Sequence, residues 1–373
     1  NLKISFTYNT ATSSFKSNIE DIKLFGGKQN VKFEGKGSNW QATVTAGIKV
    51  PQVKQLLTTV FPELDIQTLE GDFSINAKAS GIGGDRFQID ALITSKDISY
   101  EDSNSSGVYQ ANLTTELSIQ GNARKLNFDL HTKLGSGFFY YTQNLSDVEQ
   151  HFYSYEPSTA IELDVLGSYQ TDSVLAIDSL AINQSQIMTV YGEGQLQINN
   201  EFNPRSISLN LAELDLGEFL KQVDYPELPF VEKSKLILSG NLSASISADD
   251  LKGTKPRLSS KIELNDISYS YDDQALGIGG VSGLINWNLS GVAEQSTLSW
   301  SEGNFQLLPF DGSVLNFRLG TNSLSIDKFK LPILGGKIVV DSVSVQELGV
   351  NMQEYKYDLG INVKEIDLAE LTT

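Results

Sequence analysis

The residue types that carry most enzyme chemistry are scarce in this chain of 373 residues, which has no cysteine and two histidines. The lack of cysteine excludes thiolate catalysis, disulfides and Cys-ligated zinc or iron–sulfur centres. His131 lies in an alternating strand pattern and His151 lies beside an aromatic cluster, and neither belongs to a His-Glu-x-x-His arrangement. We therefore expect both histidines to be ordinary surface residues rather than catalytic groups or metal ligands.

The glycine-rich and acidic runs also lack the spacing that catalysis or ion binding needs. The Gly-Ile-Gly-Gly runs at residues 81–84 and 277–280 do not extend to Gly-x-Gly-x-x-Gly, and residues 280–283 have the wrong spacing for a nucleophile elbow. The acidic pairs at residues 101–102 and 272–273 lack the Asp-x-Asp-x-Asp-Gly pattern of a calcium loop. These runs are typical of turns and solvated loop tips, so we expect no enzyme activity, no cofactor and no metal.

Charge and composition exclude further classes of protein. The 46 Asp and Glu residues against 28 Lys and Arg residues give a net charge of -18, which argues against nucleic acid as a partner because phosphates must be neutralised by cations. The hydrophobic content of 40% argues against disorder. No run approaches the ~20 apolar residues that span a bilayer, and no signal peptide is visible. Because the chain begins at Asn1, we expect it to be a piece of a longer protein.

Period-two alternation of apolar and polar residues is the main structural signal. It is clear at residues 161–167, 207–211, 262–264, 285–289 and 315–319, and similar runs cover most of the chain with Gly, Asn, Asp and Ser between them. Antiparallel sheets with one covered and one wet face give this pattern, whereas buried parallel strands read as continuous apolar runs. The sequence therefore predicts a mostly β protein with about 20 antiparallel strands.

Helical signals are few and short. Residues 51–60 begin with proline and carry apolar residues at helical spacing, and residues 215–223 begin with an acidic N-cap and show the same pattern. Residues 367–371 begin a third segment of this kind, and Ser146 with Glu149 forms a capping box. We expect short helices at all four places.

Several landmarks recur in the same order along the chain. Pro-Glu-Leu recurs at residues 62–64 and 226–228, an offset of 164, and Asp-Ile-Ser-Tyr at 97–100 and 266–269, an offset of 169. A third landmark begins at residues 19, 177 and 326, where an Ile-x-x-apolar-x-apolar pattern repeats. The sequence predicts repeats at residues 1–176 and 177–325 and the start of a third at 326–373, with a helical and aromatic insertion near 138–156 in the first. Stacked repeats of this kind bury their apolar surface against their neighbours.

Three features of the sequence together resemble the AsmA-like superfamily of Gram-negative envelope proteins, particularly its YdbH- and TamB-like branches. They are LPILGGK at residues 331–337 with its degenerate partner KLFGGK at 23–28, the runs ELDLGEFLKQV at 213–223 and EIDLAELTT at 365–373, and the strand LSGNLSASIS at 238–247. The resemblance covers nearly the whole chain. It implies a long, curved antiparallel sheet forming an open groove with an apolar inner face.

The resemblance also implies the function. Such proteins are anchored in the inner membrane by an N-terminal helix and let phospholipids pass across the periplasm to the outer membrane, which maintains the outer membrane. This chain departs from the pattern because it lacks the anchor helix, so contacts with the two membranes are expected outside this fragment. Phospholipid is the expected partner, other envelope proteins are possible partners, and no nucleic acid is expected. The expected location is the periplasm of a Gram-negative bacterium.

The candidate lipid-groove lining consists of the apolar members of the alternating strands: Ile161, Leu163, Val165, Ile207, Leu209, Leu211, Leu236, Leu238, Ile262, Leu264, Ile285, Trp287, Leu289, Leu315, Phe317 and Leu319. An apolar sheet face must be covered by something, and the pattern does not say whether that cover is lipid or protein. The main alternative is therefore a β-repeat scaffold or adhesin with a dry core. A glycan-active β-helix enzyme is disfavoured because no distinctive pair of carboxylates is present.

Overall fold

The computed structural model describes residues 3–24, 26–60, 66–83, 86–103, 105–144, 150–170, 174–198, 202–224, 235–250, 256–271, 276–289, 293–305, 308–346 and 356–364. These residues form 23 strands and two α-helices, which confirms the mostly β fold predicted from the alternation. The chain divides into two compact units. Unit 1 holds residues 1–185, 195–202 and 222–226, and unit 2 holds residues 186–194, 203–221 and 227–373.

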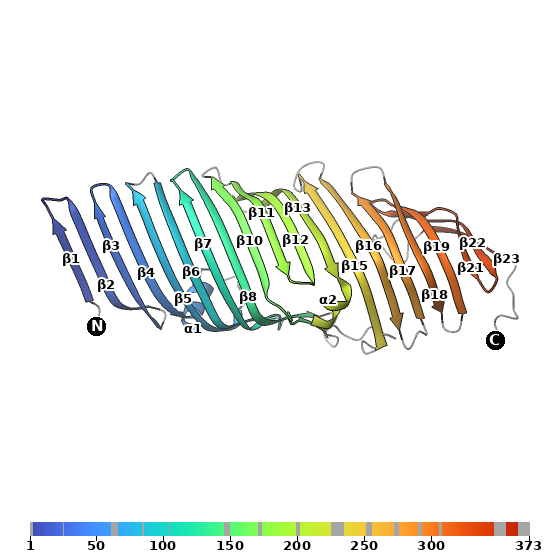
Figure 1. The fold of residues 1–373 in the computed structure, drawn as a ribbon, viewed down its shortest axis with the longest axis horizontal. Helices are drawn as coiled ribbons and strands as arrows, with labels where there is room; N and C mark the ends of the chain where they lie inside the picture. Colours follow the sequence, from blue (N-terminus) through green and yellow to red (C-terminus); the bar gives the residue numbers. More distant parts are fainter. Residues whose placement is uncertain are drawn as a thin grey trace. The chain divides into compact units, whose positions relative to one another are not determined.

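Unit 1 is a ladder of long antiparallel strands joined by tight hairpins (Figure 1). Its elements are β1 (Lys3–Asn9), β2 (Ser14–Leu24), β3 (Gly27–Lys36), β4 (Asn39–Lys49), α1 (Val50–Val60), β5 (Ile66–Ile82), β6 (Arg86–Asp102), β7 (Gly107–Gly121), β8 (Lys125–Asn144), β9 (Gln150–Tyr155), β10 (Ile161–Gln170), β11 (Val174–Gln184) and β14 (Val223–Asp224). Strands β1 to β8 pair in chain order, β10 pairs with β8 and β11, and β9 pairs with β8 and β14.

Unit 2 is built in the same way. Its elements are β13 (Phe202–Asp215), α2 (Leu216–Gln222), β15 (Leu236–Asp249), β16 (Arg257–Tyr271), β17 (Leu276–Asn288), β18 (Gln295–Phe305), β19 (Leu308–Leu319), β20 (Ser323–Ile326), β21 (Phe329–Ile333), β22 (Gly336–Gln346) and β23 (Lys356–Lys364). Strand β12 (Met188–Ile198) has residues in both units, and the first residue of β13, Phe202, and the last of α2, Gln222, belong to unit 1. Strand β13 pairs with β15, strands β15 to β19 pair in chain order, and β20 and β21 both pair with β19 and β22. Among the residues that the structure describes, the pairings of unit 2 are antiparallel except for a single parallel bridge between Trp287 and Leu319.

Both described helices lie where the sequence predicted them. Helix α1 begins one residue before Pro51, and α2 is capped by Asp215, whose Oδ1 accepts a hydrogen bond of 2.9 Å from the Glu218 amide. Neither helix has the length and apolar content to cross a membrane. The predicted helix at residues 367–371 and the capping box at 146–149 lie outside the described residues, and the parts of the insertion on either side of 145–149 are strands β8 and β9.

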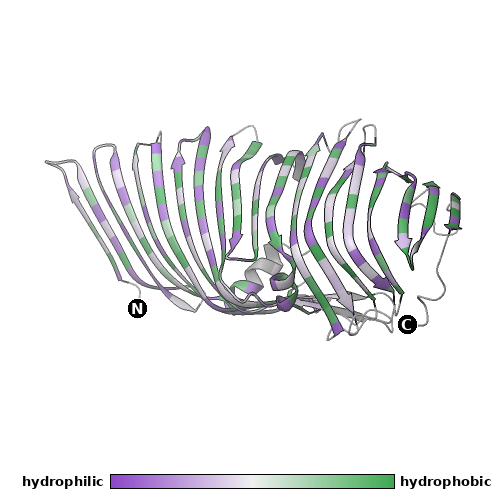
Figure 2. Cartoon of the chain, turned by 45° about the vertical axis from the view of Figure 1, so that its right-hand side comes forward, coloured by the Kyte–Doolittle hydropathy of each residue, from purple (hydrophilic) through white to green (hydrophobic). Residues whose placement is uncertain are grey.

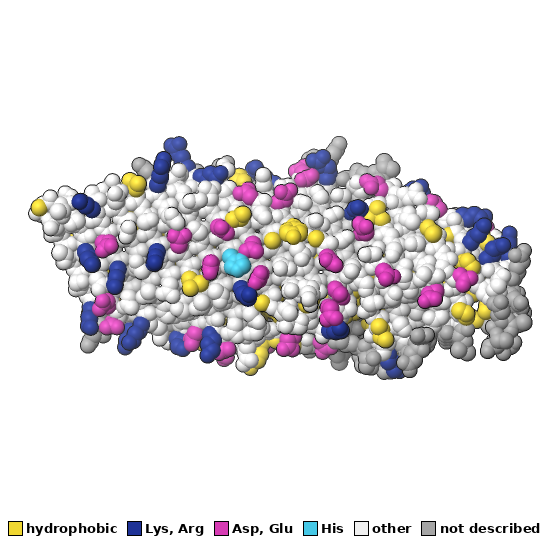
Figure 3. Space-filling view, viewed as in Figure 1, with side chains coloured by type: hydrophobic (Ala, Val, Ile, Leu, Met, Phe, Trp, Pro, Cys, Tyr) yellow, Lys and Arg dark blue, Asp and Glu magenta, His cyan; other side chains and the backbone are white. Residues whose placement is uncertain are grey.

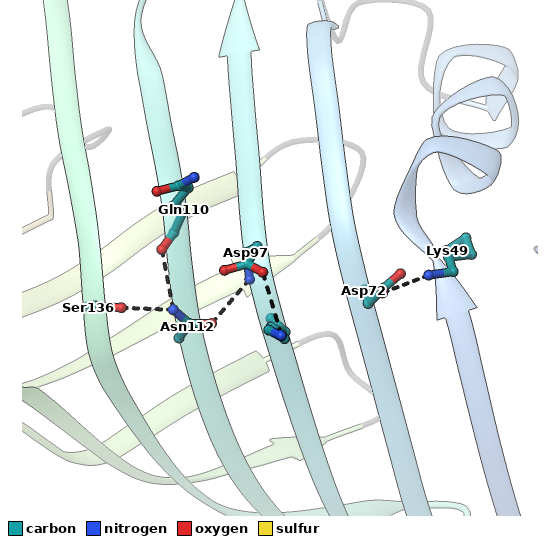
Figure 4. A network of polar contacts seen from close by, with 7 residues as sticks. Lys49, Asp72, Asp97, Gln110, Asn112 and Ser136 are labelled. Atoms are coloured by element: carbon teal, nitrogen blue, oxygen red, sulfur yellow. Dashed lines mark hydrogen bonds and ion pairs between the residues drawn. The ribbon is translucent and has the colours of Figure 1, made fainter.

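The strands of unit 1 bend at a bulge that the structure builds from one glycine and one aspartate. Gly71 in β5 has a φ of +112° and stands opposite Asp97 in β6, which has a φ of +53° and is the extra residue of the bulge. The Asp97 amide donates to Oδ1 of Asn112 over 3.1 Å (Figure 4). The Gln110 amide donates to Oγ of Ser99 over 3.1 Å. These bonds satisfy backbone donors that the bulge removes from the ladder.

The same bend occurs in unit 2, with each residue 169 or 170 positions further along the chain. Gly240 in β15 has a φ of +103° and stands opposite Asp266 in β16, whose φ is +51°. The Asp266 amide donates to Oγ of Ser282 over 3.0 Å, and the Gly280 amide donates to Oγ of Ser268 over 3.2 Å. The Asp-Ile-Ser-Tyr landmark therefore marks the bulge in both units, while the exact repeat boundaries at residues 177 and 326 stay a prediction.

Candidate functional site: the apolar face of the sheet

Register places apolar side chains from many strands in straight rows across unit 1. Directly paired residues of an antiparallel sheet share a face, so the pairings join ten apolar residues in one central row. In order from β1 to β11, without β9, they are Ile4, Ile19, Val31, Val44, Ala77, Ala91, Leu117, Leu130, Val165 and Leu180. At about 4.8 Å per strand the row is on the order of 43 Å long. We call the face that carries this row the apolar face.

Two more rows flank the central row on the side of the hairpins. The nearer one contains Phe33, Ile89, Ile119 and Phe128, and the outer one contains Phe15, Trp40, Phe87 and Tyr169. Glycines alternate with the large rings: a Cβ at Gly35, Gly81 or Gly167 would lie within 2.6 Å of the ring of Phe15, Trp40 or Phe128. Each ring thus covers a neighbouring glycine, which fills the gap left by the missing side chain.

The apolar face is only partly covered by the described residues. A small core forms where Val50 at the start of α1 meets Ile98, Ala111 and Leu134. Away from this core most row residues are half-buried, and Phe33 in the inner strand β3 is 37% exposed. Alternating hydrophobic and hydrophilic bands run along the strands in Figure 2. Exposed apolar surface that continues over many strands is unusual in folded domains, and it makes this face the candidate binding surface.

The sixteen residues predicted to line a groove lie on such faces. Ile161, Leu163 and Val165 of β10 are on the apolar face of unit 1, because Val165 is in the central row and the other two precede it at even spacing. The remaining thirteen belong to unit 2. There, one row joins Leu214, Leu242, Leu264, Gly283, Leu298 and Leu315, and a second joins Leu211, Ala244, Ile262 and Ile285.

The degree of burial differs among these sixteen. Val165 and Phe317 are buried, Leu209 is 38% exposed, and the others are intermediate. Leu236 and Leu238 lie on the far side of the bend from Leu242, on the same face by alternation, and Leu289 lies just past the end of β17. The geometry is that of a wall with few covering side chains. Whether lipid covers it stays a prediction.

Sequence reasoning missed most of the central row in unit 1, from β1 to β8. Its members there include alanines, such as Ala77 and Ala91, which carry a weak hydrophobic signal. The Phe-Ser-Ile-Asn-Ala-Lys-Ala run at residues 73–79 does alternate with period two, and this signal could have found them. The alternation of aromatic residues with glycines between strands was not visible, because it depends on register between distant residues.

The opposite face of unit 1, which we call the polar face, carries charged and amide side chains (Figure 3). His131 lies on it at 2.5 Å from Asp164, between Nδ1 and Oδ1, and both side chains are largely exposed. The hydrogen bond to Asp164 raises the pKa of His131 above its ordinary value of 6.5, and the charges of Glu162 and Glu116 act in the same direction. In the part of the chain that is described, no group of three or more His, Cys, Asp or Glu side chains could hold a metal.

The aromatic insertion predicted near 138–156 is held to the end of unit 1 by a buried amide cluster. Gln184 is fully buried, and its Nε2 donates to Oε1 of Gln222 over 2.7 Å while its Oε1 accepts a hydrogen bond from the Tyr155 hydroxyl. Burial raises the pKa of the Tyr155 phenol. The Ser158 amide donates to Oε1 of Gln222 over 2.8 Å. Because these side chains bond to one another, the cluster stabilises the fold and does not offer a reactive group.

Comparison with known proteins adds no relative. No family model matches the chain, and neither the curated proteins nor the solved structures contain a match.

Proposed function

We propose that this protein is a segment of a periplasmic lipid-transfer protein, in which phospholipid acyl chains lie along the apolar face of the sheet and move between the inner and outer membranes. One observation carries the proposal: the central row of unit 1 holds ten apolar residues from ten strands without a polar interruption. Acyl chains need no specific contacts, only a continuous apolar surface.

Partial exposure of this surface favours lipid over a dry protein core as its cover. Leu209, for example, is 38% exposed and Ile246 beside it is 44% exposed, whereas residues of a closed sandwich core are mostly buried. A scaffold or adhesin with a dry core remains the alternative outcome. The resemblance to AsmA-like envelope proteins supports the periplasmic location and the two membranes as the ends of the path.

Photo-crosslinking at two adjacent positions of β7 tests the proposal. A photoreactive residue at Leu117 faces the apolar side, and one at Glu116 faces the polar side, because neighbouring strand residues point to opposite faces. In cells of a Gram-negative host we expect lipid adducts at Leu117, detected by mass spectrometry, and at least tenfold fewer at Glu116. Equal labelling at both positions, or none at Leu117, would contradict lipid passage.

A charged substitution separates a conduit from a dry core. Leu209→Asp places a carboxylate on a partly exposed part of the apolar face of unit 2. A conduit predicts a folded protein with a normal circular dichroism spectrum and reduced lipid binding. A dry core predicts unfolding, because an unpaired buried charge is costly. Asn210→Asp is the matched control, since Asn210 is exposed on the polar side of the same strand.

A further inference from the structure

Four basic residues flank the hairpin turns at one end of the strands of unit 1. They are Lys36 at the end of β3, Arg86 at the start of β6, and Arg124 and Lys125 at the turn between β7 and β8. None of the four forms an ion pair with a residue that the structure describes. We call this edge the hairpin rim; basic side chains gather along the corresponding upper edge in Figure 3. Asp85 and Asp172 of the same turns lie outside the described residues.

A hollow of about 1160 Å³ lies beside the hairpin rim on the polar face, over strands β1 to β8. Its lining includes Lys16, Lys36 and Arg86, with one carboxylate, Glu34, at 3.9 Å from Lys16. Uncharged amides complete it: Asn39, Gln41, Gln120 and Asn127. In a protein with a net charge of -18, a hollow whose described lining carries three cations and one anion is a local exception that attracts anions.

Aromatic side chains lie on the other face of the same strand ends. Phe15, Trp40 and Phe87 form the outermost row of the apolar face there. The indole Nε1 of Trp40 donates to the carbonyl of Gly83 in the turn over 3.0 Å, so its polar end points to the rim. Aromatic rings and long basic side chains at one level of a surface are the combination that membrane proteins place at the boundary between hydrocarbon and headgroups. Here both kinds of side chain lie at the level of the strand ends.

We propose that the hairpin rim of unit 1 binds the phosphate group of a lipid headgroup, with Lys36 and Arg86 as its cationic partners and the acyl chains on the apolar face. This inference rests on the proposed function. Charge-assisted hydrogen bonds from ammonium and guanidinium groups to phosphate are strong, and the amides offer donors to headgroup oxygens. Headgroups held at this rim would keep every lipid in the same orientation as it passes from strand to strand.

The corresponding end of the strands in unit 2, which we call the rim of unit 2, supports this assignment because basic residues there already have partners. Two of the arginines described there have carboxylate partners: Arg318 lies 3.2 Å from Asp327, and Arg257 lies 3.9 Å from Asp249. Neutralised cations attract phosphate less than unpaired ones do. We therefore place the headgroup contact in unit 1.

The test uses the double variant Lys36→Gln/Arg86→Gln and the control Lys32→Gln/Lys78→Gln. The control removes the same charge from the same face, outside the hollow. Binding of the whole chain to phosphatidylglycerol and to diacylglycerol, which has the same acyl chains and no phosphate, is measured by lipid transfer from labelled vesicles at low salt. We expect the double variant to lose at least tenfold in phosphatidylglycerol affinity and to bind diacylglycerol unchanged, and the control to change less than twofold.

Two results would overturn the inference. If the double variant binds phosphatidylglycerol like the unmodified chain while crosslinking at Leu117 persists, the rim does not hold the phosphate and the proposed lipid passage still stands. Free glycerol 3-phosphate distinguishes the source of the phosphate. If it binds through Lys36 and Arg86 while Leu117 acquires no lipid, the ligand is a free phosphate compound, and both the lipid headgroup and the lipid passage are excluded.

Discussion

The bends of the two units have the same backbone geometry and different side chains. Each places a glycine with positive φ opposite a left-handed aspartate. The aspartate amide is bound by Asn112 in unit 1 and by Ser282 in unit 2, and the left-handed residue that follows in the next strand is Gln110 or Gly280. The bend therefore requires a backbone conformation and a side-chain acceptor, and more than one residue type meets each requirement.

The hairpin rims of the two units carry similar residue types but differ in their ion pairs. Both carry basic residues at the turns, but in unit 2 Arg318 and Arg257 have carboxylate partners, while in unit 1 Lys36 and Arg86 have none among the described residues. The difference indicates that the bend is set by folding, whereas the rim is free to carry function. The following predictions test this comparison, from the largest expected effect to the smallest.

The bend glycines are expected to be the most sensitive positions in both units. A Cβ at Gly240 would lie 2.6 Å from the Asp266 carbonyl oxygen, and one at Gly71 would lie 2.8 Å from that of Asp97. Together with the positive φ, Gly71→Val or Gly240→Val should each lower the free energy of unfolding by about 3 kcal/mol. Urea denaturation followed by circular dichroism measures this loss.

Strand glycines at which an added Cβ would make only ordinary van der Waals contacts are the controls for that prediction. Gly135 in unit 1 has its nearest neighbour, the Asn112 carbonyl oxygen, at 3.8 Å, and Gly279 in unit 2 has its nearest at 3.5 Å. Gly135→Ala and Gly279→Ala should leave the unfolding free energy within about 0.5 kcal/mol. If valine at a bend glycine were tolerated as well as alanine at these positions, the bend would not depend on glycine.

An exchange at the left-handed position should have a smaller effect of opposite sign in the two units. Gln110 holds a φ of +51°, so Gln110→Gly relieves strain and should raise the free energy of unfolding by up to about 1 kcal/mol. Gly280→Gln adds that strain and also brings a Cβ to 2.6 Å from Oγ of Ser301, so it should cost about 2 kcal/mol. The same denaturation experiment checks both, and equal signs would refute the equivalence of the two bends.

The smallest effect concerns the pH dependence that the pair of His131 and Asp164 gives to unit 1. Because Asp164 raises the pKa of His131 in the folded state, protonated His131 stabilises the fold fully below its unfolded pKa of about 6.5. This contribution is lost as the pH rises through the folded pKa. Titration of the imidazole by NMR should show that Asp164→Asn lowers the pKa of His131. An unchanged pKa would mean that the pair does not persist in solution.

Much of the fold could be predicted from the sequence, because the signals are local. The alternation within residues 207–211 or 262–264 depends only on neighbouring residues, and the cap at Asp215 needs only the three residues after it. Less of the candidate site could be predicted. The sixteen predicted groove residues were chosen from the alternation within their own strands, and whether they contact lipid stays a prediction. Most of the central row of unit 1 was missed because alanines such as Ala77 count as apolar only when their neighbours in adjacent strands are known.

The sequence by itself determined the strand period, the antiparallel class, the two described helices and the recurrence of Asp-Ile-Ser-Tyr at both bends. Only the tertiary structure decided which residues share a row, since register depends on pairing between strands and each bulge shifts it by one residue. Lys36 and Arg86 illustrate this point: 50 positions separate them in the sequence, yet both line one hollow. The physical reason is that alternation and capping act within a few residues, whereas register and the exposure of a face are properties of the whole sheet.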